Sequence, residues 1–319
     1  SLLHAYANWN KRSFLLDPAD QSTLQRLVCA ADIVVSNDPA LDYDLLERWH
    51  PGVIAAVITP YGLTGPLAGA PGNDLTANAL SSWAASQGDP GEPPLKAPPH
   101  QVGYLAGLAA FPAILAAVYE RDQSGLGQLI DVSELETQCS VAAPSLLVAE
   151  YAGAVAPRHK PDMVRGPIPA ADGYVSLTIS RAQFWRDAMT VLGLHDLAED
   201  RRYAAGFFRQ QHRDEYSGRV EERVRGWKRW ELFRALSELR CVIGVVQDME
   251  DLAKDPHLRE RGFFAEAELP GGVQASFPGA PFKSSATAWS RRLPAPWLGE
   301  HTAQIAVEMG LSVRTEVRA

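Results

Sequence analysis

The chain has 319 residues, enough for one large domain or two modest ones, and its 46% apolar and 21% charged residues are typical of a globular protein. Its net charge is −8 at pH 7, so binding to nucleic acid or to an anionic membrane would require a strong local basic patch. The sequence offers only short basic pairs, Lys11-Arg12, Arg201-Arg202 and Arg291-Arg292. We therefore expect neither nucleic acid nor a membrane as a partner.

The cysteines and the start of the chain bear on the compartment. Cys29, Cys139 and Cys241 are far apart and lack CxxC spacing, which argues against both a disulfide framework and a zinc site. The chain begins Ser1-Leu2-Leu3-His4, without Met and without the basic start of a secretory signal. We expect a cytoplasmic protein without a metal site, whose sequence starts inside a longer gene product.

The first half of the chain alternates between helix and strand patterns. Its strands are short and apolar on both sides, which indicates parallel pairing in a doubly wound α/β sheet. Ser133-x-x-Glu136 has the spacing of a capping box and should begin a helix. The expected elements are helices over 20–31, 41–49, 102–119 and 133–151, and strands over 32–35, 53–59 and 128–132.

The stretch from Val102 to Tyr119 is uncharged and has about the minimum length of a transmembrane helix. It also contains Gly103, Gly107 and Pro112, and no basic anchors flank it. We predict a buried helix in a protein core, which ends at Gly125-x-Gly127.

The second half has a different character, with alternating strands and amphipathic helices. Asp172-Gly173 is a turn signal, and Ser180-x-x-Gln183 has capping-box spacing ahead of a helix that stops at Gly193. These patterns predict a smaller α+β domain, and we place a large domain at 1–157, the small domain at 158–280 and a C-terminal segment at 281–319. The expected elements are strands over 174–179 and 242–246, helices over 183–193, 214–224 and 229–239, and a hairpin of 263–269 with 273–277.

Motifs of several common sites are absent, including the GxSxG elbow, the Walker loop, HExxH, and GxGxxG after a strand. Residues 61–66, Tyr-Gly-Leu-Thr-Gly-Pro, form a glycine-rich loop after a strand, where open α/β sheets bind ligands. A tight turn explains this loop about as well.

A series of short motifs carries more weight, because it runs through nearly the whole chain in one order. The series resembles the class III coenzyme A transferases, also called the carnitine dehydratase family. The motifs are Asn10-Lys11-Arg12-Ser13, Leu16-Asp17, 31–37 (ADIVVSN), Tyr61-Gly62-x-Thr64-Gly65-Pro66, 71–75 (PGNDL), 105–108 (LAGL), 114–117 (ILAA), Gly125-x-Gly127-Gln128-x-x-Asp131-Val132-Ser133, 171–175 (ADGYV), Asp255-Pro256, Arg261-Gly262 and 298–302 (LGEHT).

The resemblance implies a fold, an assembly and a reaction. The fold has a Rossmann-like large domain with a mostly parallel sheet, and a small α+β domain. In the assembly, two chains interlock as an obligate dimer, either a homodimer or a pair with a related or fused partner. An aspartate attacks the thioester of an acyl-CoA to give a mixed anhydride. The CoA thiolate then forms an aspartyl-CoA thioester, from which an acceptor carboxylic acid takes the CoA. CoA is thus a substrate, and no permanently bound cofactor is implied.

The resemblance also implies which residues contact CoA. Lys11 and Arg12 could supply cations for the CoA phosphates, although a solvated pair beside a turn is the alternative. Asn37 falls where a strand end touches the nucleotide, and Tyr61 and Gly62 line the loop above it. Asn73 completes the set of candidate CoA contacts.

The chain departs from the family pattern at the residues that carry the chemistry. Gly103 occupies the position of the nucleophilic aspartate, and glycine offers no carboxylate. In the related racemases a histidine precedes an aspartate, whereas here Asn73 precedes Asp74, and Asn is no base at neutral pH. The loop after Asn37 is shortened to residues 38–41, and the family's opening strand-turn-helix would have to precede Ser1.

Three interpretations follow from these departures. In the first, the chain is a degenerate half or subunit of a larger transferase. In the second, it is an active transferase or racemase using another residue, with Asp74 and His100 as candidates. The structural alternatives are that Asp74 caps the helix that follows it and that His100 is merely exposed in a Pro-rich loop. In the third, it is a CoA-ester-binding or scaffold domain without chemistry.

Overall fold

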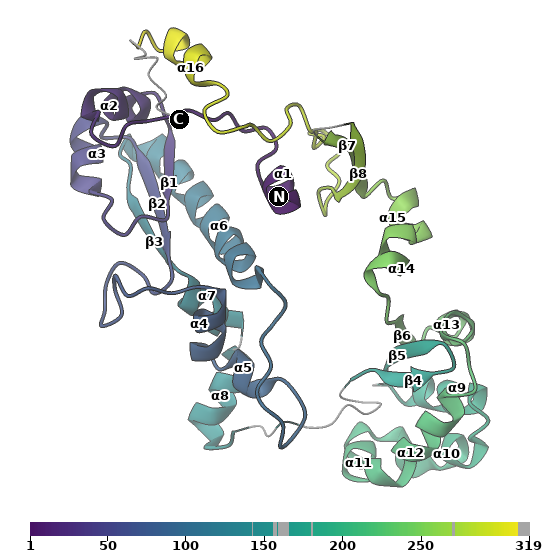
Figure 1. Cartoon of the computed structure of the whole chain (residues 1–319). Coiled ribbons are helices and arrows are strands. Elements are labelled where there is room, and N and C mark those ends of the chain that lie inside the picture. The colour runs from purple at the N-terminus through teal and green to yellow at the C-terminus, as the bar shows by residue number, and fades with distance from the viewer. Residues whose placement is uncertain (142, 156–157, 159–165, 180, 270–271, 312–319) are drawn as a thin grey trace. The chain divides into compact units, whose positions relative to one another are not determined.

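The computed structural model describes residues 1–141, 143–155, 158, 166–179, 181–269 and 272–311. The chain divides into two compact units (Figure 1). Unit 1 contains residues 1–85, 95–155 and 256–319, and unit 2 contains residues 86–94 and 156–255. Residues 256–280 thus group with unit 1, and the domain boundaries proposed from the sequence stay a prediction.

Unit 1 is built on a three-stranded parallel sheet. Its strands are β1 (Ile33–Ser36), β2 (Ile54–Thr59) and β3 (Leu129–Ser133), in the order β1-β2-β3. The predicted α/β fold with a parallel sheet is confirmed. Residues 53–57 at the central strand are fully buried, which explains why this strand is a continuous apolar run in the sequence.

Helices cover both faces of this sheet. On one face, α2 (Gln21–Cys29) and α3 (Tyr43–Trp49) pack through Val28 and Leu46 against Ala55. On the other face, α6 (Gln101–Ser124) packs through Ala106 against Ile58. Ala55 and Ile58 differ by an odd number of positions, so their side chains point to opposite faces of β2.

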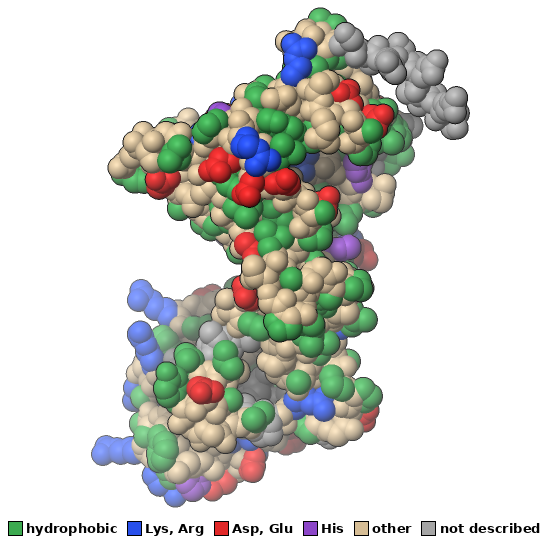
Figure 2. Space-filling view, turned by 90° about the vertical axis from the view of Figure 1, so that its left-hand side faces the viewer, with side chains coloured by type: hydrophobic (Ala, Val, Ile, Leu, Met, Phe, Trp, Pro, Cys, Tyr) green, Lys and Arg blue, Asp and Glu red, His purple; other side chains and the backbone are tan. Residues whose placement is uncertain are grey.

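Acidic residues begin α2 and α3. The Asp20 carboxylate accepts a hydrogen bond from the Thr23 N–H at 3.0 Å, and Asp42 accepts one from the Leu45 N–H at 3.0 Å. Further along α3, Glu47 is exposed. Red carboxylates gather at this end of unit 1 in the space-filling view, and green hydrophobic side chains are spread over the surface between the charged ones (Figure 2).

The long helix α6 is not the buried core helix that the sequence predicted. Only 22% of its most apolar 18-residue window is buried. Within the described residues it is the one helix that is long and apolar enough to cross a membrane, judged by length and composition alone. Its inward positions are mostly small residues. Its large side chains point outward, with 49–71% of their surface exposed: Tyr104, Leu108, Phe111, Leu115 and Tyr119. Composition alone could not show which side of the helix this chain covers.

After β3, the predicted helix over 133–151 is divided into α7 (Glu134–Val141) and α8 (Ala143–Ala152). The Ser133 hydroxyl accepts a hydrogen bond from the Glu136 N–H at 3.2 Å, so the predicted start of α7 is confirmed. Three short helices complete this part of unit 1: α1 (Leu2–Ala7), α4 (Asp74–Leu80) and α5 (Trp83–Ser86).

The C-terminal part of unit 1 returns to its N-terminal residues. It contains α15 (Pro256–Glu260), the antiparallel hairpin of β7 (Phe264–Leu269) and β8 (Val273–Pro278), and α16 (Thr302–Glu308). The hairpin was predicted and is confirmed, while turn residues 270–271 lie outside the described residues. The His301 N–H donates to the Ser13 carbonyl at 3.0 Å, and the Leu15 N–H donates to the Thr302 hydroxyl at 2.9 Å.

Unit 2 is an α+β fold around an antiparallel sheet in the order β4-β5-β6. Trp185, Tyr216 and Leu232 are fully buried at its centre. The capping box predicted at Ser180 lies outside the described residues. The elements are β4 (Ile168–Ala170), β5 (Gly173–Thr178), α9 (Ala182–Val191), α10 (His195–Glu199), a 3₁₀ turn (Arg201–Ala204), α11 (Gly206–Gln211), α12 (Arg213–Val224), α13 (Arg229–Glu238), β6 (Val242–Val245) and α14 (Met249–Lys254).

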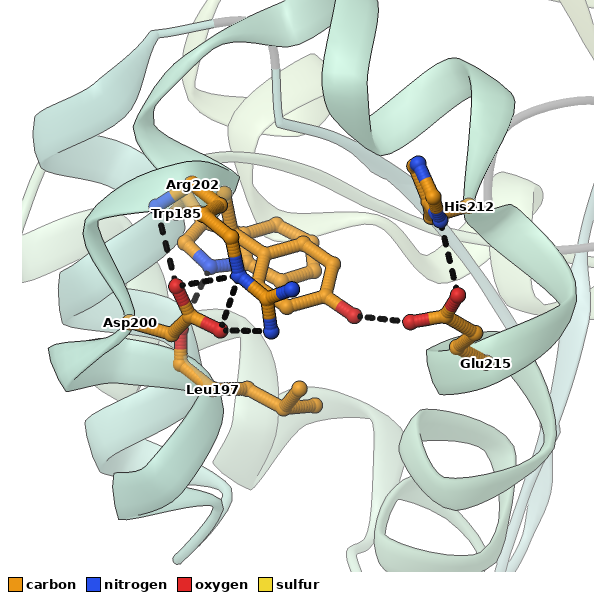
Figure 3. Close-up of polar contacts among 7 residues, drawn as sticks. Trp185, Leu197, Asp200, Arg202, His212 and Glu215 are labelled. Atoms are coloured by element: carbon orange, nitrogen blue, oxygen red, sulfur yellow. Dashed lines mark hydrogen bonds and ion pairs between the residues drawn. The ribbon is translucent and has the colours of Figure 1, made fainter.

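Polar contacts connect the helices of unit 2 (Figure 3). The indole N–H of buried Trp185 donates to the Leu197 carbonyl at 2.9 Å, which joins α9 to α10. Glu215 accepts the Tyr203 hydroxyl at 2.9 Å and lies 2.7 Å from His212 Nδ1. Burial, together with Glu215, raises the pKa of Tyr203 to about 12. This network is explained by its structural role in holding the helices of unit 2 together.

Candidate functional site

The glycine-rich loop after β2 is fixed to the neighbouring strand by a carboxylate. Both oxygens of Asp131 on β3 accept the Leu63 N–H, at 3.1 and 3.0 Å, and the Gly62 N–H donates to the Thr59 hydroxyl at 2.9 Å. Gly62 has a φ of 85°, a left-handed conformation that glycine adopts without strain. The loop is thus held at the carboxyl edge of the parallel sheet, where ligands bind in this class of fold.

Tyr61 connects this loop to the start of α4. Its hydroxyl donates to the Thr76 hydroxyl at 3.0 Å. Its ring packs against the backbone of Gly72, where an added Cβ would lie only 2.9 Å from Tyr61 Cζ and from its hydroxyl oxygen. Any larger residue at Gly72 would displace the ring.

Asn73 is the N-cap of α4. Its side-chain oxygen accepts from the N–H groups of Leu75 and Thr76 at 2.9 and 3.1 Å, and its own N–H donates to the Thr76 hydroxyl at 2.9 Å. This reciprocal capping box explains Asn73 structurally. A CoA contact by this side chain is therefore not needed to account for it.

Asp74 caps a helix, but not the one expected from the sequence. It is the first residue of α4, whose cap is Asn73, and its carboxylate accepts the Val102 N–H at 3.1 Å in the first turn of α6. It also forms an ion pair with Lys96. The expected structural role is thus corrected from α4 to α6. Burial opposes ionisation, but Lys96, the Val102 N–H and His100 outweigh it and hold the pKa of Asp74 below its ordinary value.

His100 and Gly103 lie at the start of α6. His100 is exposed and occupies the N-cap position with a left-handed φ of 67°, without a capping hydrogen bond from its side chain. Gly103 is exposed in the first turn, and a Cβ built on it would meet no atom within 4 Å. A carboxylate at position 103 would therefore fit without steric conflict, close to the positive end of the helix dipole.

The predicted phosphate-binding cations make other contacts. Lys11 Nζ donates to the Asn8 side chain at 3.1 Å, and Arg12 forms two hydrogen bonds with Glu308 of α16 at 2.9 and 2.8 Å. Arg12 is thus already paired with a carboxylate. Asn37 follows β1 and is exposed at the same edge of the sheet as the loop after β2.

Glu134 is a residue that sequence reasoning missed. It begins α7 directly after β3, and α7 packs against both α4 and α6. Burial raises the pKa of Glu134, and the nearby charge of Asp74 raises it further. A carboxylate immediately after a strand of a parallel sheet is the only sequence signal that could have indicated it.

Two buried amides lie one helical turn beyond these carboxylates. Asn78 is four residues after Asp74 on α4, and Gln138 is four residues after Glu134 on α7, so each shares a helix face with its carboxylate. Gln138 is completely buried, and neither of its side-chain polar atoms has a hydrogen-bond partner among the described residues. The same holds for the Asn78 Nδ2 atom. Buried amides without partners are uncommon and are typical of interiors that also hold water.

Within the described residues, no group of three or more His, Cys, Asp or Glu side chains could hold a metal ion. Cys29, Cys139 and Cys241 are all free thiols. What the site offers is therefore a glycine-rich loop, helix N-termini and the carboxyls of Asp74 and Glu134. Such groups can bind an anionic or thioester ligand and transfer protons.

Comparison with known families identifies the chain. The family described as CoA-transferase family III matches residues 1–302. The chain belongs to CoA-transferase family III. The resemblance seen in the sequence is thereby confirmed.

Curated relatives in this family are transferases of CoA. The chain is 29% identical to the succinate–glutarate CoA-transferase of Agrobacterium fabrum, over 97% of this chain and 80% of that protein. It is 28% identical to succinyl-CoA:(R)-benzylsuccinate CoA-transferase subunit BbsE of Thauera aromatica, over 97% of this chain and 81% of that protein.

Solved structures agree on the fold. A CaiB/BaiF family protein from Brucella suis superposes with a TM-score of 0.82 at 27% identity, covering 97% of this chain and 84% of that one. Rv3272 from M. tuberculosis superposes with a TM-score of 0.81 at 23% identity, covering 93% and 83%. These likenesses support the mixed α/β fold with a parallel sheet.

Proposed function

We propose that this chain binds acyl-CoA thioesters at the carboxyl edge of its parallel sheet and takes part in transfer of CoA between carboxylic acids. CoA acts as a substrate, and no permanently bound cofactor is required. The family match over residues 1–302 supports the reaction class. The loop held by Asp131 supports the location, because it lies at the carboxyl edge of the parallel sheet, where open α/β folds bind ligands.

We propose further that the chain is a degenerate half of the enzyme, and the observation that carries this is Gly103. The space beside it is open, so no other described group fills the position of an acid there. Asp74, whose carboxylate contacts the first turn of α6, already accepts the Val102 N–H and pairs with Lys96. A carboxylate held this way is a poor nucleophile, since attack on a thioester would break both contacts.

A partner chain of either kind would cover the exposed face of α6, and a related partner that keeps the aspartate, in a heterodimer or a fusion, would also supply the missing acid. We propose a Rossmann-like large domain in an interlocked homodimer, or a heterodimer or fusion with a related chain. Phe111 and Leu108 are 62% and 69% exposed on one side of α6, and α8, which follows α7, also exposes Leu146 and Tyr151. Apolar surface on this scale is typical of subunit interfaces.

The acyl groups we propose are short dicarboxylic acids, because the relatives of Agrobacterium fabrum and Thauera aromatica carry succinate, glutarate or benzylsuccinate in their names. We place the reaction in the cytoplasm, without nucleic acid or a membrane as partner. The three free thiols and the net charge of −8 support this assignment.

One observation favours a second candidate, an active transferase or racemase that uses another residue. Glu134 lies close to Asp74, and the pKa of Glu134 is raised whereas that of Asp74 is lowered. Two carboxyls with pKa values moved apart are typical of an acid and base pair. In this alternative Glu134 moves a proton at the α-carbon of an acyl-CoA, and Asp74 keeps it protonated to higher pH.

Binding of CoA tests the proposal that both candidates share. Calorimetry with CoA and succinyl-CoA should give weak binding to the wild type, and Asn37→Ala together with Tyr61→Phe should weaken it further. Gln123→Ala, at an exposed position near the end of α6, is the matched control and should bind as the wild type does. A folded wild type that binds neither compound at millimolar concentration would contradict the proposal.

A further inference from the structure

An open cavity lies in the C-terminal part of unit 1, away from the residues of the candidate site. It has a volume of about 470 Å³ and is lined by residues of α15, of the turn just before β7 and of the segment after β8. Gly279 closes its base, since its N–H donates to the Phe263 carbonyl at 2.7 Å and a Cβ there would lie 2.5 Å from that oxygen. The volume falls within the usual range of small-molecule sites, which is roughly 300–1,000 Å³.

The charges around this cavity are all of one sign. Arg261 and Lys283 line it, and none of its lining residues is acidic. In the part of the chain that the structure describes, neither side chain forms an ion pair or a hydrogen bond. Two cations and no acid among the lining residues make the cavity positive, which favours an anion between them.

The walls of the cavity are aromatic. Phe263, Phe282 and Trp289 line it, and Phe282 and Trp289 are 62% and 43% exposed. Trp289 also packs against Trp9, with ring centroids 5.6 Å apart. Exposed aromatic faces beside cations are the features on which nucleobases stack in proteins.

We propose that this cavity is a nucleotide site, which binds a purine ring against Trp289 and Phe282 and a phosphate between Arg261 and Lys283. A free adenine nucleotide and the phosphoadenosine end of CoA share this chemistry. The cavity has no residue in common with the candidate site, so binding here does not require the proposed transferase reaction.

Calorimetry with AMP tests the proposal, with adenosine and inorganic phosphate as the two half-ligands. AMP should bind the wild type more tightly than either half-ligand. Arg261→Gln and Lys283→Gln should each weaken AMP binding by about tenfold, the effect expected for loss of one charge-assisted contact. Arg234→Gln, which removes an exposed cation in unit 2, is the matched control and should leave AMP binding unchanged.

Two further measurements keep the test decisive. Lys283 lies in an exposed segment, so Lys283→Gln should fold even if Arg261→Gln does not. Competition between CoA and AMP identifies the source of the nucleotide. If CoA displaces AMP from the wild type and this displacement is absent in Lys283→Gln, the cavity binds the nucleotide of CoA. If AMP binds equally with and without CoA, the cavity binds a free nucleotide. Equal AMP binding by the wild type and both variants, or no AMP binding at all, would overturn the proposal.

Discussion

Glu134 shows how one residue acquires unusual chemistry from its neighbours. Its place directly after a strand is the one local sequence signal, and in the structure it lies half-buried at the end of β3 and close to the ionised carboxylate of Asp74. Both effects disfavour its charged form. Its pKa is therefore raised in the folded chain relative to the unfolded chain, and folding and ionisation of Glu134 oppose each other.

We predict that Glu134→Gln stabilises the chain at pH 7, by a few degrees in melting temperature. A carboxyl with a raised pKa in the folded state binds its proton more tightly there, so its ionisation costs stability as pH rises through and beyond the unfolded value. Gln has the same shape and no charge, which removes that cost. Thermal unfolding of both proteins at pH 7 and near pH 4 measures the effect.

The stability difference between Glu134→Gln and the wild type should shrink as pH falls below the ordinary glutamate value of 4.5, because Glu134 then becomes protonated in both the folded and the unfolded state. Glu136→Gln, an exposed position on the same helix, is the control and should change little. A gain for Glu134→Gln that is equal at both pH values would contradict the electrostatic explanation.

The polar residues differ in how far sequence could predict them. The capping of α7 by Ser133 depends on neighbours along the chain and was predictable. The bond from the Val102 N–H to Asp74 joins segments that only the fold brings together, so capping was assigned to the wrong helix. Glu134 was missed for the same reason, since its effect depends on burial and on Asp74.

At the scale of elements, Asp74 joins α4 to α6. Its carboxylate satisfies one of the free N–H groups in the first turn of α6 and pairs with Lys96 in the preceding loop. The start of α6, including His100 and Gly103, is positioned by this contact. Its removal should therefore loosen the candidate site as well as lower stability.

We predict that Asp74→Ala lowers the free energy of unfolding by about 1–2 kcal/mol, the usual cost of losing a capping side chain. Asp74→Asn keeps an acceptor for the Val102 N–H and should lose less. Because folding lowers the pKa of Asp74, its ionised carboxylate stabilises the chain at pH values above 3.8, the ordinary pKa of aspartate.

That stabilisation is lost as pH falls through the pKa that Asp74 has in the folded state. The free energy of unfolding measured by urea denaturation should thus be higher for the wild type than for Asp74→Asn at pH 7. In strongly acidic solution the two values should be equal. An Asp74→Asn protein as stable as the wild type at pH 7 would show that the Lys96 ion pair contributes nothing.

The secondary structure of both units was largely predictable because it follows local patterns. Apolar runs marked β1, β2 and β3, and glycine after α6 marked its end. The burial of α6 was not predictable, because the same apolar composition suits a core helix and a helix that another chain covers. Which face of α6 this chain covers depends on the tertiary fold, so the exposure of Phe111 and Leu108 did not follow from the local sequence.

For the whole molecule, the exposed face of α6 leads to a prediction about association. We expect the wild type to sediment as a dimer at micromolar concentration, and Phe111→Glu to shift it toward the monomer, since a buried charge at an interface is costly. Phe111 is 62% exposed in the single chain, so the substitution should not unfold it.

Gln123→Glu adds the same charge at an exposed polar position of α6 and serves as the control, which should remain dimeric. A well-folded wild-type monomer at this concentration would contradict the proposed assembly.

The central claim is that a chain of CoA-transferase family III lacks its own acid at Gly103. The most direct measurement is the intact mass of the protein after incubation with succinyl-CoA and trapping with hydroxylamine or borohydride. Gly103→Asp should show little adduct, and any that forms should lie at residue 103. Gly107→Asp, one turn further along α6 at a glycine that also has open space, is the matched control. We expect no covalent CoA or acyl adduct on the wild type, and such an adduct on any residue would contradict the proposal that this chain lacks its own acid.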